Sequence, residues 1–233
     1  MTLKVSWLTG FPSRNRQKPR DQIGSRDVGD SIVYGKWDAE GGWAARLRNH
    51  IDERYNIGKR TGLLVHILGV PSEPVVRLAD RIHNELAARI DKSGKNLLIL
   101  SSGLNDSCPN NKATGELTPP DMFKEAYGRL IDIGKEFGCT VLALGLTPVN
   151  PARSKGLLFS DELVAEYDWY ITEVCREKGI AKLELLDTLT QENFADHLVD
   201  SAHPDSIGHE RLFTVIRDYL EKEGLIKVLI PED

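Results

Sequence analysis

In residues 96–106, NLLILSSGLND, a short apolar run leads directly into a turn that carries an amide and a carboxylate side chain. Short, nearly continuous apolar runs are typical of strands that are covered on both faces. Three further runs share this pattern: 61–68 (TGLLVHIL), 140–146 (TVLALGL) and 181–186 (AKLELL). The stretch therefore indicates a buried strand with polar side chains at its carboxyl end.

Segments with helical periodicity alternate with these runs. Apolar residues recur every three or four positions in 43–51, 78–90, 122–137, 163–174 and 212–219. Pro119 and Pro120 are placed to open the third segment, and Gly179 to close the fourth. We interpret the stripes as core packing, and the alternation predicts an α/β fold with a parallel sheet between helices. Because no repeat or linker divides the chain, we expect one domain over residues 1–233.

The first 26 residues fit this pattern least well. A strand could form over residues 4–9, but residues 11–26 (FPSRNRQKPRDQIGSR) are polar, basic and rich in turn formers. That composition favours a mobile or surface-draped segment. A short strand over residues 25–28 is the alternative, and the sequence does not decide between the two.

Composition narrows the classes of function. The 30 basic and 35 acidic residues leave a mildly acidic protein, which argues against nucleic acid as a partner. No apolar run approaches the roughly 20 residues that cross a bilayer, and residues 1–20 lack the apolar core of a signal peptide, so we expect no membrane association and a cytoplasmic location. Three widely spaced cysteines, Cys108, Cys139 and Cys175, are expected to be buried, reduced thiols.

Candidate functional residues follow the apolar runs, because ligands of open parallel sheets bind beyond the carboxyl ends of the strands. Three segments qualify: residues 69–73 (GVPSE), 103–106 (GLND) and, after the last run and a connecting segment, 200–204 (DSAHP). Residues 29–31 (GDS) are considered with them as a fourth segment. Together they supply a hydroxyl, an imidazole, carboxylates, an amide and glycine turns. These groups are the components of a serine hydrolase.

Three of these residues can form a nucleophile and its base. A serine hydroxyl becomes an effective nucleophile when an imidazole accepts its proton, and the imidazole needs an acceptor on its other nitrogen. Ser31, His203 and Asp200 can fill these roles, since the Asp-x-x-His spacing brings carboxylate and ring within reach on a turn. The other histidines are interpreted as structural: His50, His66, His83, His197 and His209.

The tetrahedral intermediate of such a reaction also needs hydrogen-bond donors around its oxyanion. The candidates are the backbone N–H groups of Ser31 and Gly69 and the side-chain amide of Asn105. Asp30 and Asp106 are expected to hold loops rather than to take part in chemistry. No sequence motif for a metal, dinucleotide or nucleotide is present, so we expect no cofactor.

Each candidate also has a purely structural interpretation. Gly-Asp-Ser is a common turn sequence, and Asp200, Asp205 or Ser206 could cap the last helix. Asn105 could be an Asx-turn residue, and Gly69 a turn glycine at a strand end. The catalytic interpretation is stronger because four segments with complementary roles occur together.

In this order, the four segments resemble the blocks of the SGNH (GDSL) hydrolase family, over residues 29 to about 212. The resemblance implies a flavodoxin-like, three-layer α/β/α sandwich and no metal or organic cofactor. It implies Ser31 as nucleophile and first oxyanion donor, Gly69 and Asn105 as the other donors, and Asp200 and His203 as the orienting acid and base. The stretches around Ser31 and His203 also resemble those of intracellular bacterial or archaeal members with esterase or thioesterase activity.

Two stretches depart from the family pattern. Residues 23–28 (IGSRDV) precede Gly-Asp-Ser where a hydrophobic strand is usual, and the second block, often Gly-x-x-Gly, is residues 69–72 (GVPS). The expected substrate is a small acyl ester, a thioester or an acetylated sugar. A catalytically silent carbohydrate- or acyl-binding module, or an acyltransferase with the same residues, is the alternative. Trp37 and Trp43 could line an acyl or sugar pocket, although Trp43 also begins a helical stripe.

Overall fold

The computed structural model describes residues 24–58, 62–90 and 95–229. Within them, five parallel strands form one sheet in the order β2-β1-β3-β4-β5. The strands are β1 (Gly24–Gly29), β2 (Leu64–Gly69), β3 (Asn96–Ser101), β4 (Cys139–Leu144) and β5 (Ala181–Leu183). This order is that of flavodoxin-like folds, and the four strands predicted from apolar runs are confirmed with boundaries shifted by a few residues.

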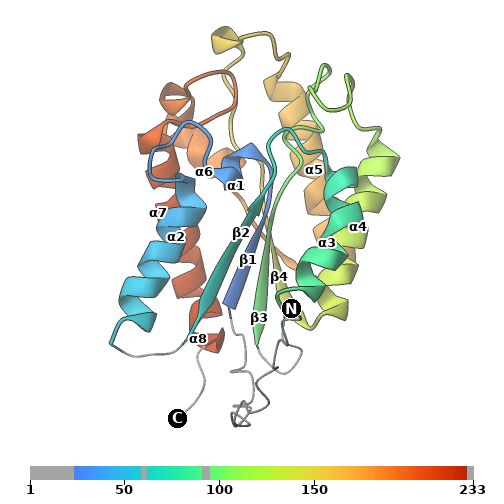
Figure 1. Cartoon of the computed structure of the whole chain (residues 1–233). Helices are drawn as coiled ribbons and strands as arrows, with labels where there is room; N and C mark the ends of the chain where they lie inside the picture. Colours follow the sequence, from blue (N-terminus) through green and yellow to red (C-terminus); the bar gives the residue numbers. More distant parts are fainter. Residues whose placement is uncertain (1–23, 59–61, 91–94, 230–233) are drawn as a thin grey trace, which may run out of the picture.

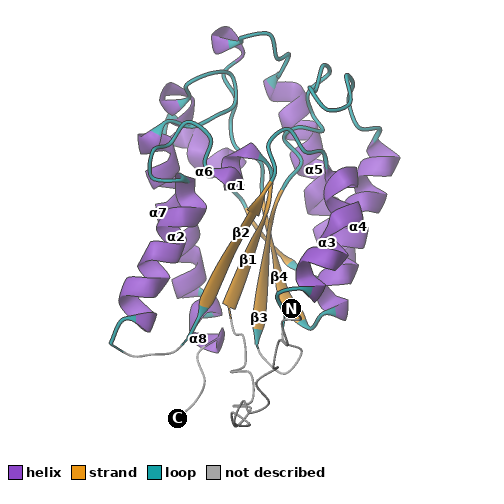
Figure 2. Ribbon diagram, in the orientation of Figure 1, coloured by secondary structure: helices purple, strands orange, loops and turns teal. Residues whose placement is uncertain are grey.

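Helices cover both faces of the sheet, which confirms the three-layer α/β/α sandwich (Figure 1 and Figure 2). The helices are α1 (Ser31–Tyr34), α2 (Gly42–Ile51), α3 (Val75–Ala87), α4 (Pro120–Glu136), α5 (Asp161–Lys178), α6 (Leu186–Gln191), α7 (Ser206–Lys222) and α8 (Leu225–Leu229). On one face α3 packs against α4 and α4 against α5, whereas α2 and α7 pack together on the other. All five predicted helices are present.

Strand β1 settles the question left open at residues 25–28. It is a regular strand between β2 and β3, although it carries two charged residues that are fully buried, Arg26 and Asp27. The Arg26 guanidinium donates to the Asn96 side chain (2.8 Å) and to the Arg89 carbonyl, and Ser25 donates to Asp27 (2.5 Å). The strand thus ends directly at the Gly-Asp-Ser turn. The possible strand at 4–9 and most of the segment interpreted as mobile lie outside the described residues.

Several smaller predictions are also decided by the structure. Pro119 caps α4 and Gly179, in the left-handed conformation, caps α5. The three cysteines are free and buried. Trp43 is 1% exposed and belongs to the core, as its place in the helical stripe indicates. Met122, in contrast, is half exposed, because its place in the first turn of α4 faces away from the sheet.

Candidate active site

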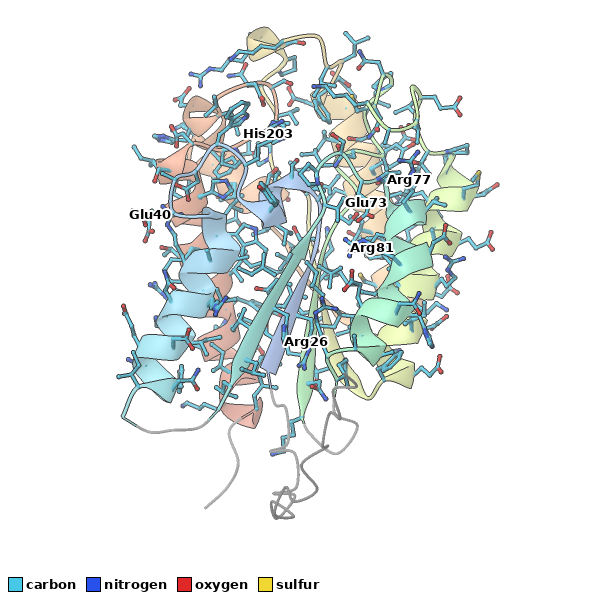
Figure 3. All side chains as sticks on the ribbon, viewed as in Figure 1. Arg26, Glu40, Glu73, Arg77, Arg81 and His203 are labelled. Carbon is cyan, nitrogen blue, oxygen red and sulfur yellow. The ribbon has the colours of Figure 1, made fainter. Side chains whose placement is uncertain are left out.

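The residues predicted as nucleophile, base and orienting acid meet at the carboxyl end of the sheet. Ser31 begins α1 directly after β1, and Asp200 and His203 lie in the loop before α7. The Ser31 Oγ lies 2.9 Å from His203 Nε2, and His203 Nδ1 lies 2.8 Å from both carboxylate oxygens of Asp200. Figure 3 shows His203 beyond this end of the strands, while Arg26 lies toward the opposite end. All three side chains are largely buried.

The electrostatics of this chain fix the direction of its hydrogen bonds. The Asp200 Oδ1 accepts the backbone N–H groups of Ala202 (3.0 Å) and His203 (2.9 Å). Although burial raises the pKa of Asp200, the hydrogen bonds from the His203 ring and from these N–H groups hold it well below its ordinary value. An ionised carboxylate only accepts, so His203 Nδ1–H donates to it, and in the neutral imidazole Nε2 is then the acceptor for the Ser31 hydroxyl. That is the arrangement a general base requires.

The loop that carries Asp200 is anchored independently of the last helix. Asp205, not Asp200, caps α7 by accepting the Gly208 N–H (2.8 Å). The Val199 N–H donates to the His203 carbonyl (2.8 Å), which closes the turn between the acid and the base. The residue that caps α7 is therefore Asp205, and the Asp200 carboxylate contacts the His203 imidazole instead.

Asp30 links the nucleophile turn to Asn105. Its Oδ1 accepts the Ile32 N–H (2.9 Å) and caps α1, while its Oδ2 accepts the Asn105 side-chain amide (3.0 Å). An amide nitrogen has two N–H groups, so the second one remains for another acceptor. Burial raises the pKa of Asp30 to about 6, against the lowering effect of these hydrogen bonds.

Asp106 joins three loops behind the site. Its carboxylate accepts the Val75 N–H (3.0 Å), at the start of α3, and the Thr118 hydroxyl (2.6 Å), just before α4. Burial raises its pKa to about 7. Asn111, which is also buried, donates to the Asn105 carbonyl (2.8 Å) and so supports the same loop.

Gly69, predicted as an oxyanion donor, lies at the end of β2 and is not among the residues that line the cavity beside Ser31. It ends β2 opposite Gly29, and a Cβ at this position would lie 2.4 Å from the Tyr34 backbone nitrogen in α1. Its lack of a side chain thus lets α1 rest on β2. The chain reaches the site three residues later, at Ser72, which has a positive φ of 64°.

A cavity of about 20 Å³ lies beside Ser31. It is lined by Asp30, Ser31, Ile32, Lys36, Ser72, Leu104, Asn105, Cys108, Asn111, Lys112, Leu157, Phe159, Ala202 and His203. Gly69 is not among the lining residues, whereas Cys108 is. Burial raises the pKa of the Cys108 thiol, which donates to Asn110 (3.3 Å), so it is a poor nucleophile.

The other histidines have structural partners or lie away from the cavity. His209 is fully buried, accepts the Trp43 N–H (3.3 Å) and contacts the Lys36 carbonyl (3.4 Å), and burial lowers its pKa.

Among residues 24–58, 62–90 and 95–229, no group of three or more His, Cys, Asp or Glu side chains is arranged to hold a metal ion. In the same ranges, no helix combines the length and apolarity needed to cross a membrane.

One contact of the site has no signal in the sequence. The indole N–H of Trp37 donates to the Asp200 Oδ2 at 3.2 Å, across 163 positions of the chain. The residue types and spacings that identify Ser31 and His203 do not pair a tryptophan with this carboxylate. Only the three-dimensional arrangement reveals it.

Solved structures with a similar fold include esterases and acylhydrolases. An acetyl xylan esterase, AlAXEase, is 17% identical with a TM-score of 0.69, covering 85% of this chain and 100% of that one. A lipase/acylhydrolase from Enterococcus faecalis is 18% identical with a TM-score of 0.68, covering 91% and 100%. An acetylxylan esterase from Geobacillus stearothermophilus is 14% identical with a TM-score of 0.63, covering 84% and 93%.

The sequence itself gives the family. No curated protein matches the chain in sequence. The model of the GDSL-like lipase/acylhydrolase family matches residues 28–211, which include the Gly-Asp-Ser turn and the loop of His203. With this match over most of its length, the chain belongs to the GDSL-like lipase/acylhydrolase family and is an esterase of the GDSL (SGNH) type.

Proposed function

We propose that this esterase cleaves short acyl esters through an acyl-enzyme formed on Ser31. The proposal rests on the two hydrogen bonds that connect Ser31 to His203 and His203 to Asp200, beside a small cavity. In acyl transfer, the serine hydroxyl gives its proton to a neutral imidazole. An ionised carboxylate holds that imidazole in place and stabilises its protonated form.

The cycle has two halves that use the same groups. Ser31 Oγ forms a bond to the acyl carbon as its proton passes to His203 Nε2, and the bond to the alcohol oxygen then breaks as His203 returns that proton to the leaving alcohol. A water molecule next gives a proton to His203 and attacks the acyl carbon. The bond to Ser31 Oγ breaks, the serine is reprotonated, and the carboxylic acid leaves.

The oxyanion of each tetrahedral intermediate needs donors at the cavity. We assign this role to the Ser31 backbone N–H and to the second N–H of the Asn105 amide. For the third donor, the backbone N–H of Ser72 is better supported than that of Gly69. Ser72 lines the cavity, and Gly69 is packed beneath α1.

The size of the cavity favours a short acyl group. A volume of about 20 Å³ is close to what one water molecule needs, and a methyl group is of similar size. We therefore infer an acetyl ester as the preferred substrate, as in the acetyl xylan esterases of similar fold. The leaving alcohol, whether a sugar or a simpler one, lies outside this small space.

A series of p-nitrophenyl esters tests the proposal. We expect the acetate to be hydrolysed with the highest kcat/KM and the rate to fall as the acyl chain lengthens. His203→Ala should abolish turnover, whereas His83→Ala, on the exposed side of α3, should leave it unchanged. Full activity of His203→Ala would contradict the assigned base, and a preference for long chains would contradict the assigned acyl group.

A competing acceptor separates hydrolysis from acyl transfer. With an added alcohol, a hydrolase should still release the free acid as its main product. An ester of the added alcohol as the main product would instead make the chain an acyltransferase with the same residues.

A further inference from the structure

Trp37 contacts the acid of the catalytic chain in a way that the mechanism above does not use. The two oxygens of Asp200 have different partners besides the imidazole. Oδ1 accepts two backbone N–H groups, from Ala202 and His203, whereas Oδ2 accepts the indole N–H of Trp37 at 3.2 Å. Among the residues that the structure describes, Trp37 and His203 are the side chains bonded to this carboxylate.

Burial does not explain the position of the Trp37 ring. The side chain is 59% exposed, so packing in the core holds little of it. The Lys36 ammonium lies 5.2 Å from the centroid of the indole ring, and Lys36 lines the cavity beside Ser31. The hydrogen bond to Asp200 links the indole to the loop before α7.

The backbone at Trp37 adopts a conformation that is unfavourable for tryptophan. Its φ is 70°, in the left-handed region where a Cβ crowds the following carbonyl. The loop is fastened on both sides: the Lys36 N–H donates to the Ser31 carbonyl (3.0 Å), and the Asp38 carboxylate accepts the Gly42 N–H (2.9 Å) and pairs with Arg46. A strained residue held in place beside reacting groups suggests a functional reason for the strain.

We propose that Trp37 is a positioning residue that fixes the Asp200 carboxylate, and through it the His203 ring, for catalysis; this proposal rests on the proposed function of Ser31, His203 and Asp200. With Oδ1 held by the backbone and Oδ2 by the indole, the carboxylate plane cannot rotate about χ2. The imidazole Nδ1–H therefore meets a fixed acceptor, and Nε2 stays directed at the Ser31 hydroxyl. Trp37 itself does not touch the reacting atoms.

Two substitutions at Trp37 separate this role from a structural one. Trp37→Phe keeps an aromatic ring but removes the N–H, and we expect kcat on p-nitrophenyl acetate to fall about tenfold, as for one hydrogen bond to a charged group, with KM within about twofold. Trp37→Gly removes the indole and relieves the positive φ, so its Tm should equal or exceed that of the wild type while kcat falls at least as far. Trp169→Phe, with 54% of its side chain exposed on α5, is the matched control and should keep full activity.

Proton NMR gives a readout that does not depend on turnover. The proton between His203 Nδ1 and Asp200 should give a far-downfield resonance, which should move or broaden in Trp37→Phe and stay in place in Trp169→Phe. An unchanged resonance in Trp37→Phe, or a wild-type kcat in that variant, would overturn the proposal. If wild-type protein hydrolyses no ester, the proposed function is overturned, whereas a shifted resonance still supports the placement of Asp200 by Trp37.

Discussion

Some side chains of the candidate site face the cavity, and others hold its loops in place. Asn105 illustrates both, because its amide is bound to Asp30 on one side and faces the cavity next to Ser31 on the other. A donor directed at the oxyanion stabilises the transition state more than the bound ester. The proposed role of Asn105 as an oxyanion donor should therefore appear in kcat.

For Asn105→Ala we expect kcat to fall by about 100- to 1,000-fold, the loss typical of one oxyanion donor, with KM little changed. Steady-state kinetics on p-nitrophenyl acetate measure both constants. Asn84→Ala, an exposed asparagine on α3, is the control. A rise in KM with unchanged kcat would instead assign Asn105 to ester binding.

Ser72 offers a test of a backbone donor. Its φ of 64° is unfavourable for a serine, and glycine adopts it without strain while keeping the N–H. We expect Ser72→Gly to keep activity within about threefold, because a single retained backbone donor needs no side chain, and to change the free energy of unfolding by no more than about 1 kcal/mol. Large loss of activity in folded protein would show that the hydroxyl, rather than the N–H, is required.

The sequence identifies the side chains of the candidate site better than its backbone donors and backbone conformations. Ser31, Asp200, His203 and Asn105 occur in recognisable segments, and the structure brings them together. Their catalytic roles stay predictions. Ser72 and Trp37 escape sequence analysis because positive φ values at serine and tryptophan, and a contact across 163 positions, leave no local pattern.

Among the elements, β1 shows most clearly where sequence patterns fail. Short apolar runs predict β2 to β5. The sequence of β1 contains Arg26 and Asp27, both buried, and therefore resembles that of a polar loop. The charges are accommodated by partners on other elements, Asn96 on β3 and Arg89 just after α3, which no local window contains. The Gly-Asp-Ser turn nevertheless follows a regular strand that lies between β2 and β3.

The contact between α1 and β2 depends on Gly69. A methyl group there would meet the Tyr34 nitrogen at 2.4 Å and the Asp30 carbonyl at 2.7 Å, both backbone atoms that cannot move independently. We expect Gly69→Ala to lower the free energy of unfolding by about 1–3 kcal/mol, the usual cost of overpacking, measured by urea denaturation. An unchanged free energy of unfolding would contradict this packing role of Gly69.

The molecule as a whole buries carboxyl groups whose pKa values are raised. Burial raises the pKa of Asp27 and of Asp106 to about 7 and that of Asp30 to about 6, from 3.8. A raised folded-state pKa means that the native protein binds more protons than the unfolded chain between these values. The stability from each group is therefore complete below about pH 4 and is lost as the pH rises toward 6 or 7.

Asp27→Asn isolates this effect, because asparagine does not titrate. The stability of the variant relative to wild type should rise between pH 5 and pH 8 by about 2 kcal/mol, since the wild type loses the contribution of Asp27 in this window. Urea unfolding at several pH values measures the difference, with the exposed Asp187→Asn as control. A difference that is independent of pH would contradict the raised pKa.

Labelling with a serine-reactive fluorophosphonate tests whether Ser31 is the nucleophile of this esterase. We predict that intact-mass and peptide analysis will find one adduct, on Ser31, in the wild-type protein. Folded Ser31→Ala should remain unlabelled, since its Oγ is absent. Labelling of that variant, or no adduct on well-folded wild-type protein, would contradict the account.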